Sequence, residues 1–400
     1  MKQQPDQPLA EIRIIELGGV LAVPYASMML GDMGAEVIKI EKPGGDDTRH
    51  WLPPSINGES AYFLGVNRGK KSIVLDLKTD KGKEVLRALV LTADILIENI
   101  SRGSLEKLGM SCAEMRALNP RLITCSIKGY ARGTPKENDP GYDFIIQGRS
   151  GFMSITGKED PMKAGFAVAD IVTGLFAMNG ILAALYAREK DGVGVHIEVP
   201  LLSAMVASMP SIAMNYLVSR ELPKRVGNAH LNIVPYDCFN TRDGKQIIIT
   251  VGNEKQWRAF CEAIEREWLL HDSKFATNAD RIVNREELTA YIQQELLART
   301  RDEWIALFEA RNIPTGPIQN FEEVCNDPNV LQAGMLTNMK HPTAGSIWGI
   351  NSPIEFGEGG VRRAESLPPP LLGEHTNSIL LELGYSEDDI ASVVGENIVV

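Results

Sequence analysis

Length, composition and charge set the first limits on what this chain is. Its 400 residues, 44% hydrophobic and 23% charged, are typical of a folded globular protein with room for two or three domains. A net charge of −11, from 41 basic and 52 acidic residues, argues against a protein that binds nucleic acid through its phosphates. The five cysteines form no CxxC pair, so we expect reduced thiols in a cytoplasmic protein rather than disulfides or a zinc site.

The chain shows no clear targeting or membrane signal. Residues 1–13, MKQQPDQPLAEIR, contain neither an apolar core nor an Arg-rich pattern, so no export or transit signal is expected. The apolar run 171–187 is shorter than the roughly 20 residues that a membrane span requires, and the run 201–218 contains Pro210. Both runs are expected to be buried helices, and no membrane association is predicted.

The N-terminal part of the chain alternates strand and helix patterns. Residues 12–17 form a short apolar run that ends at Gly18 and Gly19, a helical stretch follows from about Ala22, and residues 36–41 have the pattern of a second strand. This order is typical of a βαβ unit, which predicts a parallel sheet and a helix N-terminus suited to phosphate. Further elements are expected as strands at 72–77, 94–98 and 122–127 and as a helix at 81–92.

The pattern changes near residue 225. A strand is expected at 195–199, before this point; after it, a strand at 245–251 leads into mostly amphipathic helix over 254–311 and a linker at 312–317. We therefore expect an α/β fold in which a Rossmann-like large domain is interrupted by a smaller α-rich domain. The expected ranges are 1–224 for the first part of the large domain, 225–325 for the small domain, and 326–400 for the return segment, with a final helix from about Thr376.

The βαβ start raises the hypothesis of a dinucleotide site, with Glu41 as the acid that binds a ribose. Positions 18–23 read GGVLAV, however, and lack the G-x-G-x-x-G pattern whose glycines let the backbone approach a pyrophosphate. An NAD-linked dehydrogenase therefore stays only as an alternative. The histidines show no metal-binding spacing and there is no G-x-S-x-G elbow, so no metal site is predicted and a serine hydrolase is disfavoured.

Two local features could carry chemistry. Residues 66–107 hold nine basic and six acidic residues, which indicates either a solvated face or a site for a compact polyanion such as nucleotide phosphates. Asp170 stands directly before the apolar run. It is either an ordinary helix N-cap, worth about 1 kcal/mol, or a nucleophile that forms an acyl anhydride. Composition and spacing do not choose between these readings.

Short motifs in one order along almost the whole chain resemble the class III coenzyme A transferases. They are LGGVLAVP at 17–24, LGDMGAEVIKIEKPG at 30–44, DTR at 47–49, Asn67, KSI at 71–73, EN at 98–99, SIKGY at 126–130, GYD at 141–143, AD at 169–170 and LLGEHT at 371–376. Within this family, RVGNAHLNIVPY at 225–236 is most similar to succinyl-CoA:dicarboxylate transferases that act on glutarate, hydroxymethylglutarate or itaconate.

The resemblance implies an activity and a fold. It implies transfer of coenzyme A from an acyl-CoA, here succinyl-CoA, to a free carboxylic acid, here a dicarboxylate. Asp170 would accept the acyl group through an aspartyl anhydride and an aspartyl-CoA thioester, with no metal and no permanently bound cofactor, because the coenzyme A thioester is a substrate. It further implies a homodimer of two interlocked ring-like chains, each with two discontinuous domains.

The resemblance also implies contacts to coenzyme A, which fall on Val20, Leu21, Ala22, Lys42, Leu75 to Lys78, Asn99, Ile100, Ser101, Lys107, Lys128, Gly129, Tyr130 and Ala131. Leu21 stands where some relatives have a glutamine. Candidates for binding the distal carboxylate of the acceptor are Arg49, Arg225 and His230. Backbone N–H groups near Gly252 or at the start of the helix at Asp170 are candidates for stabilising an oxyanion.

Two departures separate this chain from other members of the superfamily. Tyr142 stands where the racemases carry a histidine, and tyrosine is a poor group for two-way proton transfer at neutral pH. The formyl-CoA:oxalate transferases carry a run of glycines that is absent between residues 220 and 260. The alternatives left open are transfer to another acid, such as oxalate with formyl-CoA or carnitine, the NAD-linked dehydrogenase, and a non-catalytic nucleotide-binding or scaffold protein.

Overall fold

The computed structural model describes residues 7–356 and 367–390, which divide into two compact units. The first unit contains the chain up to Phe152, Ala164–Glu221 and the chain from Pro328 on; the second contains Met153–Lys163 and Leu222–Asp327. Residues 153–163 lie within the range expected for the large domain but group with the second unit. The reason is local, because Gly227 N–H donates to Gly157 O and the Arg225 guanidinium donates to Glu159 O at 2.9 Å.

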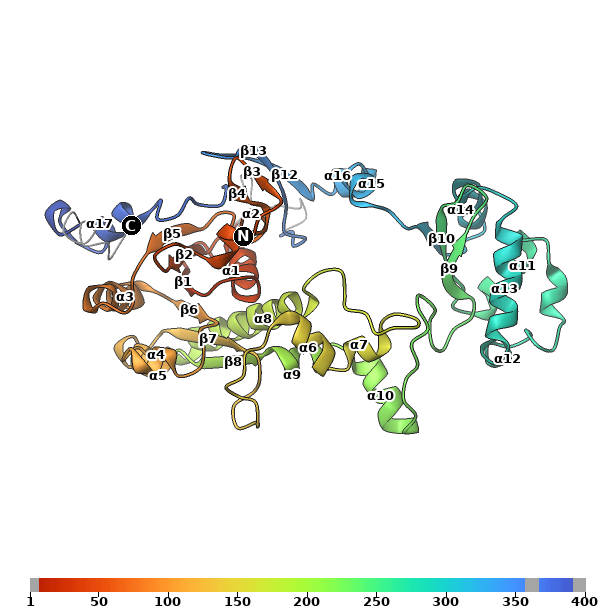
Figure 1. The fold of residues 1–400 in the computed structure, drawn as a ribbon, viewed down its shortest axis with the longest axis horizontal. Coiled ribbons are helices and arrows are strands. Elements are labelled where there is room, and N and C mark those ends of the chain that lie inside the picture. Colours follow the sequence, from red (N-terminus) through yellow and green to blue (C-terminus); the bar gives the residue numbers. More distant parts are fainter. Residues whose placement is uncertain (1–6, 357–366, 391–400) are drawn as a thin grey trace. The chain divides into compact units, whose positions relative to one another are not determined.

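A six-stranded parallel sheet forms the centre of the first unit (Figure 1). Its strand order is β5-β2-β1-β6-β7-β8, and every neighbouring pair is parallel. The strands are β1 Arg13–Leu17, β2 Glu36–Glu41, β5 Lys71–Val74, β6 Ile95–Glu98, β7 Ile123–Lys128 and β8 His196–Pro200. The predicted α/β class and parallel sheet are confirmed, and the strand predicted at 72–77 ends earlier, at Val74.

Helices cover both faces of this sheet. Neighbouring residues of a strand point to opposite faces, so Ile14 packs in the core under α1 and α8, while Ile15 packs in the core under α3, α5 and α17. The helices of the first face are α1 Ala22–Asp32, α6 Asp143–Arg149, α8 Val168–Asp191 and α9 Leu201–Ala207. Those of the second face are α3 Asp80–Thr92, α5 Cys112–Leu118 and α17 Thr376–Glu382.

Helix α8 is the longest apolar helix of the described chain. By length and composition it could cross a membrane, and so could α9 together with α10, Pro210–Ser219, as a pair bent by 73°. In the structure α8 packs against α1, α6, α9, β7 and β8, and Ala177 and Ile181 are fully buried. Of its most apolar 18-residue window 39% is buried, and a helix of a soluble protein can pass the same test of length and composition.

Shorter elements complete the first unit. They are η1 Asp47–His50, β3 Ser55–Ile56, β4 Glu59–Ser60, α2 Ala61–Val66, α4 Ser104–Lys107, α16 Pro328–Gln332 and the hairpin of β12 Leu336–His341 with β13 Gly345–Ile350, while α7 Phe152–Ile155 spans the boundary between the units. The LLGEHT motif lies along β5, where His375 N–H donates to Ser72 O and Gly373 N–H donates to Ser72 Oγ, each at 3.0 Å.

The second unit combines a small sheet with helices. The sheet is antiparallel in the order β11-β10-β9, from Thr315–Pro317, Gln246–Thr250 and Tyr236–Asn240. The helical elements are α11 Glu254–Ala263, η2 Glu267–Leu270, α12 Asn278–Val283, α13 Arg285–Leu296, α14 Arg301–Glu309 and α15 Phe321–Cys325. The stretch 312–317, predicted as a linker, contributes the edge strand β11, because Gly316 pairs with Ile248 of β10.

Candidate active site

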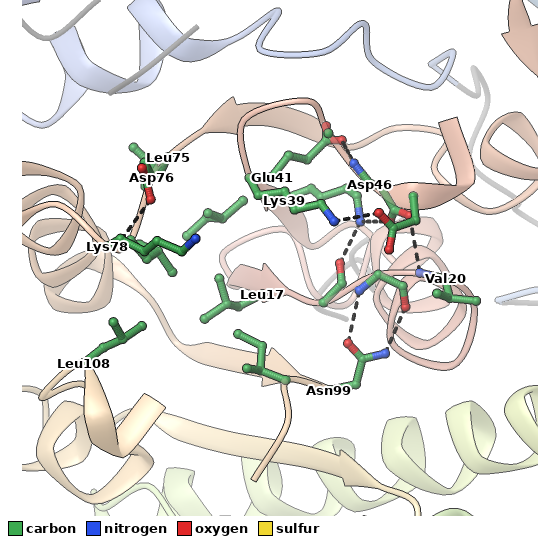
Figure 2. A pocket seen from close by; sticks show the side chains of 18 residues that line it. Leu17, Val20, Lys39, Glu41, Asp46, Leu75, Asp76, Lys78, Asn99 and Leu108 are labelled. Atoms are coloured by element: carbon green, nitrogen blue, oxygen red, sulfur yellow. Dashed lines mark hydrogen bonds and ion pairs between the residues drawn. The ribbon is translucent and has the colours of Figure 1, made fainter. Parts of the chain in front are cut away.

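A cavity of about 360 Å³ lies at the carboxyl ends of β1, β2, β5 and β6 (Figure 2). Open parallel sheets bind their ligands at this edge. Apolar side chains such as Leu17, Ile40, Leu75 and Leu108 form its walls, and charged residues join them at the strand ends. The cavity therefore suits a ligand with an apolar or aromatic part and a charged part.

The turn after β1 forms one wall of this cavity and is held in an unusual conformation. Val20 has a φ of +67°, which is rare for a β-branched residue and costs on the order of 1–3 kcal/mol. Asn99 exchanges two hydrogen bonds with Gly19, accepting from its N–H at 3.1 Å and donating to its carbonyl at 2.9 Å. A Cβ at Gly18 would lie 2.7 Å from Asn99 Oδ1, which explains the glycine there. The strain and the two bonds together define the shape of this wall.

A buried cluster of charges supports the turn from below. Lys39 is fully buried, and its ammonium lies 2.7 Å from Glu16, 2.8 Å from Asp46 and 2.8 Å from the carbonyl of Gly18. Burial opposes the ionisation of Asp46, but the charge of Lys39 outweighs it and lowers the pKa of Asp46 to about 2. No sequence motif pointed to this cluster. The only signal was a lysine and a glutamate inside apolar strands.

A second set of paired charges involves Arg49 and Glu41. The Arg49 guanidinium forms two 2.7 Å bonds to the Glu41 carboxylate and lies 3.6 Å above the ring of Phe63. Arg49 was a candidate for the distal carboxylate of the acceptor, but its guanidinium is bound inside the protein. Glu41, the acid expected to bind a ribose in the dehydrogenase alternative, is the carboxylate of this ion pair and is therefore also bound inside the protein.

The expected coenzyme A contacts divide into three groups in the structure. Eight line the cavity of Figure 2, namely Val20, Lys42, Leu75, Asp76, Leu77, Lys78, Asn99 and Ile100. Two line a second cavity, also of about 360 Å³, namely Ser101 and Lys128. The others line neither cavity: Leu21, Ala22 and Tyr130 are buried, Gly129 and Ala131 are half-buried, and Lys107 is exposed. All of these contacts stay predictions. The residues of the first group are the largest set that lines one cavity.

Asp170 lies inside α8, as the third residue of the helix. The reading of Asp170 as an N-cap is therefore wrong. Ala167 is the N-cap and has no side-chain acceptor, so the helix start takes its acceptor from another helix, where Asp143 Oδ1 accepts the N–H of Ala169 at 2.8 Å. The side chain of Asp170 is left free of a capping role.

The surroundings of Asp170 favour its neutral form more than water does. Burial, and then the charge of Asp143, raise its pKa to about 7. Burial and the charges of Asp170, Asp143 and Asp46 raise the pKa of Tyr62 to about 12. Tyr62 therefore keeps its proton at neutral pH and is a hydroxyl donor within the electrostatic reach of both carboxylates. No sequence motif pointed to Tyr62.

The remaining candidates lie in the second unit, where each has a partner within that unit. Gly252 N–H, a candidate oxyanion donor, donates to Gln256 Oε1 at 2.8 Å. Arg225 donates to backbone carbonyls, and His230 Nδ1 accepts the N–H of Asn232 at 3.1 Å. Within the described residues, no group of three or more His, Cys, Asp and Glu side chains could hold a metal ion.

Comparison with known proteins gives the chain its family. Residues 9–376 match CoA-transferase family III. The chain is 41% identical over 397 residues to a succinyl-CoA:glutarate CoA-transferase of Mus musculus, covering 98% of this chain and 90% of that protein. It is 44% identical over 385 residues to a succinate–glutarate CoA-transferase of Agrobacterium fabrum, covering 94% and 96%.

A solved structure agrees with these sequence matches. The crystal structure of a CAIB/BAIF family protein from Brucella suis superposes with a TM-score of 0.85 at 39% identity, covering 94% of this chain and 99% of that one. The match over residues 9–376 and the similarity across nearly the full length show that this chain is an enzyme that belongs to CoA-transferase family III.

Proposed function

We propose that this enzyme transfers coenzyme A from succinyl-CoA to a dicarboxylate, with glutarate as its principal acceptor. The proposal is supported by relatives named for this reaction that are 40–44% identical over nearly the whole chain. The acceptors weighed as alternatives from the sequence, oxalate and carnitine, become outcomes of the same test.

In this proposal Asp170 accepts the acyl group. The observation that supports this role is the position of Asp170, which is half-buried in the first turn of α8 close to the carboxylate of Asp143. An Asp170 oxygen attacks the thioester carbonyl of succinyl-CoA; the C–S bond breaks, and the coenzyme A thiolate leaves a mixed anhydride on Asp170. The thiolate then attacks the aspartyl carbon of the anhydride, which releases succinate and forms an aspartyl-CoA thioester.

The second half of the reaction repeats these steps in the opposite direction. The acceptor carboxylate attacks the aspartyl thioester and displaces the thiolate, which gives a new anhydride. The thiolate attacks the acceptor carbonyl, forms the product thioester and restores the Asp170 carboxylate. No proton is gained or lost overall, and one activated acyl group is exchanged for another at every step. A thiolate held in place contributes about 7–11 kcal/mol relative to one free in solution.

The side chains near Asp170 fit these steps. A carboxylate with a raised pKa is more basic than one in water and is a stronger nucleophile once it is ionised. The protonated hydroxyl of Tyr62 supplies a donor for the negative charge that develops on the attacked carbonyl oxygen. The cavity of Figure 2 takes the nucleotide end of coenzyme A, with Lys42 and Lys78 near its phosphates.

We further propose that the enzyme is a cytoplasmic homodimer of interlocked chains that does not associate with membranes. Large apolar side chains are exposed on the first unit, among them Tyr142, Phe144, Phe166, Tyr186 and Val218, and we assign this surface to a second copy of the chain. Light scattering after gel filtration is expected to give twice the chain mass. The mass of a single chain would contradict the proposal.

The direct test of the mechanism compares the wild type with Asp170→Asn. Incubation with succinyl-CoA and then hydroxylamine should modify the peptide that contains Asp170 in the wild type and leave it unmodified in the variant. Activity of the variant should fall by several orders of magnitude, on the scale seen when a nucleophile is removed. Retained turnover in the variant, or no adduct in the wild type, would exclude Asp170 as the acyl carrier.

The acceptor is tested with a panel of acids. Succinyl-CoA is mixed with glutarate, hydroxymethylglutarate, itaconate, oxalate and carnitine, and the CoA thioesters formed are read by mass spectrometry. The highest kcat/KM is expected for glutarate. A higher value for oxalate or carnitine would replace the proposed acceptor without changing the mechanism.

A further inference from the structure

Gln147 is a fully buried polar side chain of α6 with no role in the proposed mechanism. It follows Asp143 by four residues, so the two side chains lie on the same face of the helix. Gln147 Nε2 donates to Asp143 Oδ2 at 2.7 Å, and Gln147 Oε1 accepts the N–H of Ala164 at 2.8 Å. Only this orientation of the amide works, because the reversed one would place its oxygen against the carboxylate and its NH₂ against an N–H group.

Asp143 continues this connection to the start of α8. One of its oxygens is held by Gln147, and the other accepts the N–H of Ala169, the residue directly before Asp170. Ala164 and Ala169 are the two ends of the segment that leads into the helix. Gln147 thus binds one end of the segment directly and the other through Asp143.

The segment 164–169 is packed at its end, where Ala169 is fully buried and the Val168 N–H donates to Phe166 O at 2.9 Å, but its middle is exposed. A Cβ at Gly165 would have no neighbour within 4 Å, and Phe166 is 59% exposed. Ala167, the N-cap of α8, cannot accept a hydrogen bond through its side chain. Fixing the backbone of each residue costs about 1–2 kcal/mol of conformational entropy, so the position of Asp170 depends on bonds from outside the segment.

We propose that Gln147 is a positioning residue for acyl transfer, which holds Asp143 and Ala164 and so fixes the place of Asp170 relative to the thioester. This inference rests on the proposed role of Asp170 as the acyl acceptor. A displacement of about 1 Å at a reacting group can cost on the order of a hundredfold in rate. Gln147 lines none of the cavity of Figure 2, so its loss should reduce kcat and leave the KM for succinyl-CoA nearly unchanged.

The first test is Gln147→Leu, which keeps the size of the side chain and removes both hydrogen bonds. We expect kcat to fall by about tenfold to a hundredfold, with the KM for succinyl-CoA within about twofold of the wild type. The matched control is Asn119→Leu. Asn119 lies in the same unit; its amide NH₂ donates to Val90 O and Ala93 O at 2.9 Å each, and its amide oxygen accepts the N–H of Arg121 at 3.1 Å. The control should lose thermal stability and keep kcat.

The second test is Gln147→Glu, which makes the same contacts depend on pH. A protonated carboxyl at position 147 can donate to Asp143 and accept from Ala164, whereas an ionised one repels Asp143. The charged groups near this position are Asp143 on the same face of α6 and Asp170 on α8, which interacts electrostatically with Asp143. Arg149, two residues further along α6, lies on another face and over the ring of Tyr130, and α9, which also packs on α6, carries no charge.

Burial and the two carboxylates raise the pKa of the new group. The ratio of variant to wild-type kcat should therefore increase as the pH falls through that raised pKa, and it should decrease as the pH rises. Comparison of the two complete pH profiles separates the ionisation of the carboxyl at position 147, which only the variant has, from that of Asp170, which both enzymes have. Gln147→Leu has no titratable group and should give a ratio that does not change with pH.

The outcomes separate this inference from the mechanism on which it rests. If the wild type forms an Asp170 adduct and Gln147→Leu keeps the wild-type kcat, the inference is wrong and the mechanism stands. A flat pH ratio for Gln147→Glu, or an equal loss of kcat in Asn119→Leu, also overturns the inference. If the wild type forms no adduct, the mechanism fails and the inference falls with it. Should Gln147→Leu fail to fold, Gln147→Glu at low pH decides the question.

Discussion

Asn99 and Gly19 exchange two hydrogen bonds across the ends of neighbouring strands β6 and β1. These bonds hold the turn in which Val20 has its positive φ. Asn99 thus acts on the backbone that forms the cavity wall, although it was expected as a direct contact to coenzyme A. Asn99 can both hold the backbone of Gly19 and contact coenzyme A. Its effect on the backbone is testable without a ligand.

Asn99→Ala should relax this turn. Without the two bonds only the long 3.5 Å bond from Val20 N–H to Asp46 Oδ1 is left to offset the strain at Val20, so the wall should move. The KM for succinyl-CoA should then increase by about tenfold, the effect of roughly 1.4 kcal/mol. Hydrogen exchange of a peptide that contains Gly19 and Val20 should be faster in the variant without ligand. Asn119→Ala serves as the control. Unchanged exchange together with a raised KM would mean that Asn99 acts on the ligand alone.

Lys78→Ala should weaken coenzyme A binding without slowing the chemical steps. Lys78 is an exposed cation at the cavity, and loss of one charge-assisted bond to a phosphate should raise the KM for succinyl-CoA by about tenfold. The effect should shrink as salt is added, because an exposed charge is screened. Lys83→Ala, which removes a half-buried lysine paired with exposed Asp80 on α3, is the control. Equal behaviour of the two variants would remove Lys78 from the site.

Lys39→Met should destabilise the first unit. The substitution removes the ion-pair partner of buried Asp46, whereas buried Glu16 keeps its 2.7 Å pair with Lys70. Breaking a buried pair in this way costs about 3–5 kcal/mol. Urea unfolding measures the loss. In Lys71→Met, which breaks the partly exposed pair with Glu36, the loss should be about 1 kcal/mol or less. Similar losses in the two variants would show that the buried cluster tolerates the missing charge.

The rate should depend on pH through Asp170. The nucleophile must be ionised, and its pKa is raised to about 7 by burial and by Asp143. kcat/KM for succinyl-CoA should therefore decrease as the pH falls through about 7, rather than through the usual range near 4. Asp143→Asn removes the neighbouring charge and should move this limb to lower pH. If the acidic limb of the pH profile stays at the same pH in Asp143→Asn, burial alone would account for the raised pKa of Asp170.

Asp170 should also lower the stability of the folded enzyme at neutral and higher pH. Its folded pKa is raised above the unfolded value, so the folded state binds the proton more tightly and stability is lost as the pH rises between the two values. Asp170→Asn removes this cost. The variant should therefore melt at a higher temperature than the wild type at pH 8, and the difference should vanish below about pH 4. A variant that is less stable at pH 8 would contradict the raised pKa.

The sequence was most informative where structure is local. Apolar runs such as 36–41 are buried on both sheet faces, so they predict strands without knowledge of their neighbours. Thr300 and Glu303 form a capping box at the start of α14, which is a signal carried by four consecutive residues of the sequence. The linker predicted at 312–317 was wrong because its strand character comes from pairing with β10.

The sequence was least informative where two distant segments meet. Asp170 had the position of an N-cap, but the acceptor for its helix is Asp143 on another helix. Arg49 had the charge to bind a substrate carboxylate, but Glu41 on β2 takes its guanidinium. Gln147 and Tyr62 carry no motif, and their importance depends on contacts or charges from other elements. Partner choice between such elements is a property of the folded chain.

The binding of the LLGEHT motif to β5 has a consequence for biosynthesis. Gly373 donates to the Ser72 hydroxyl, and that hydroxyl donates to Glu41, the carboxylate that also holds Arg49 at the cavity. The ribosome makes the residues of the cavity first and those that buttress its edge last. A nascent chain therefore carries a cavity with an unfinished edge until residue 376 has left the exit tunnel. If the cavity binds coenzyme A as proposed, translation stalled before that point should yield a chain that does not retain coenzyme A.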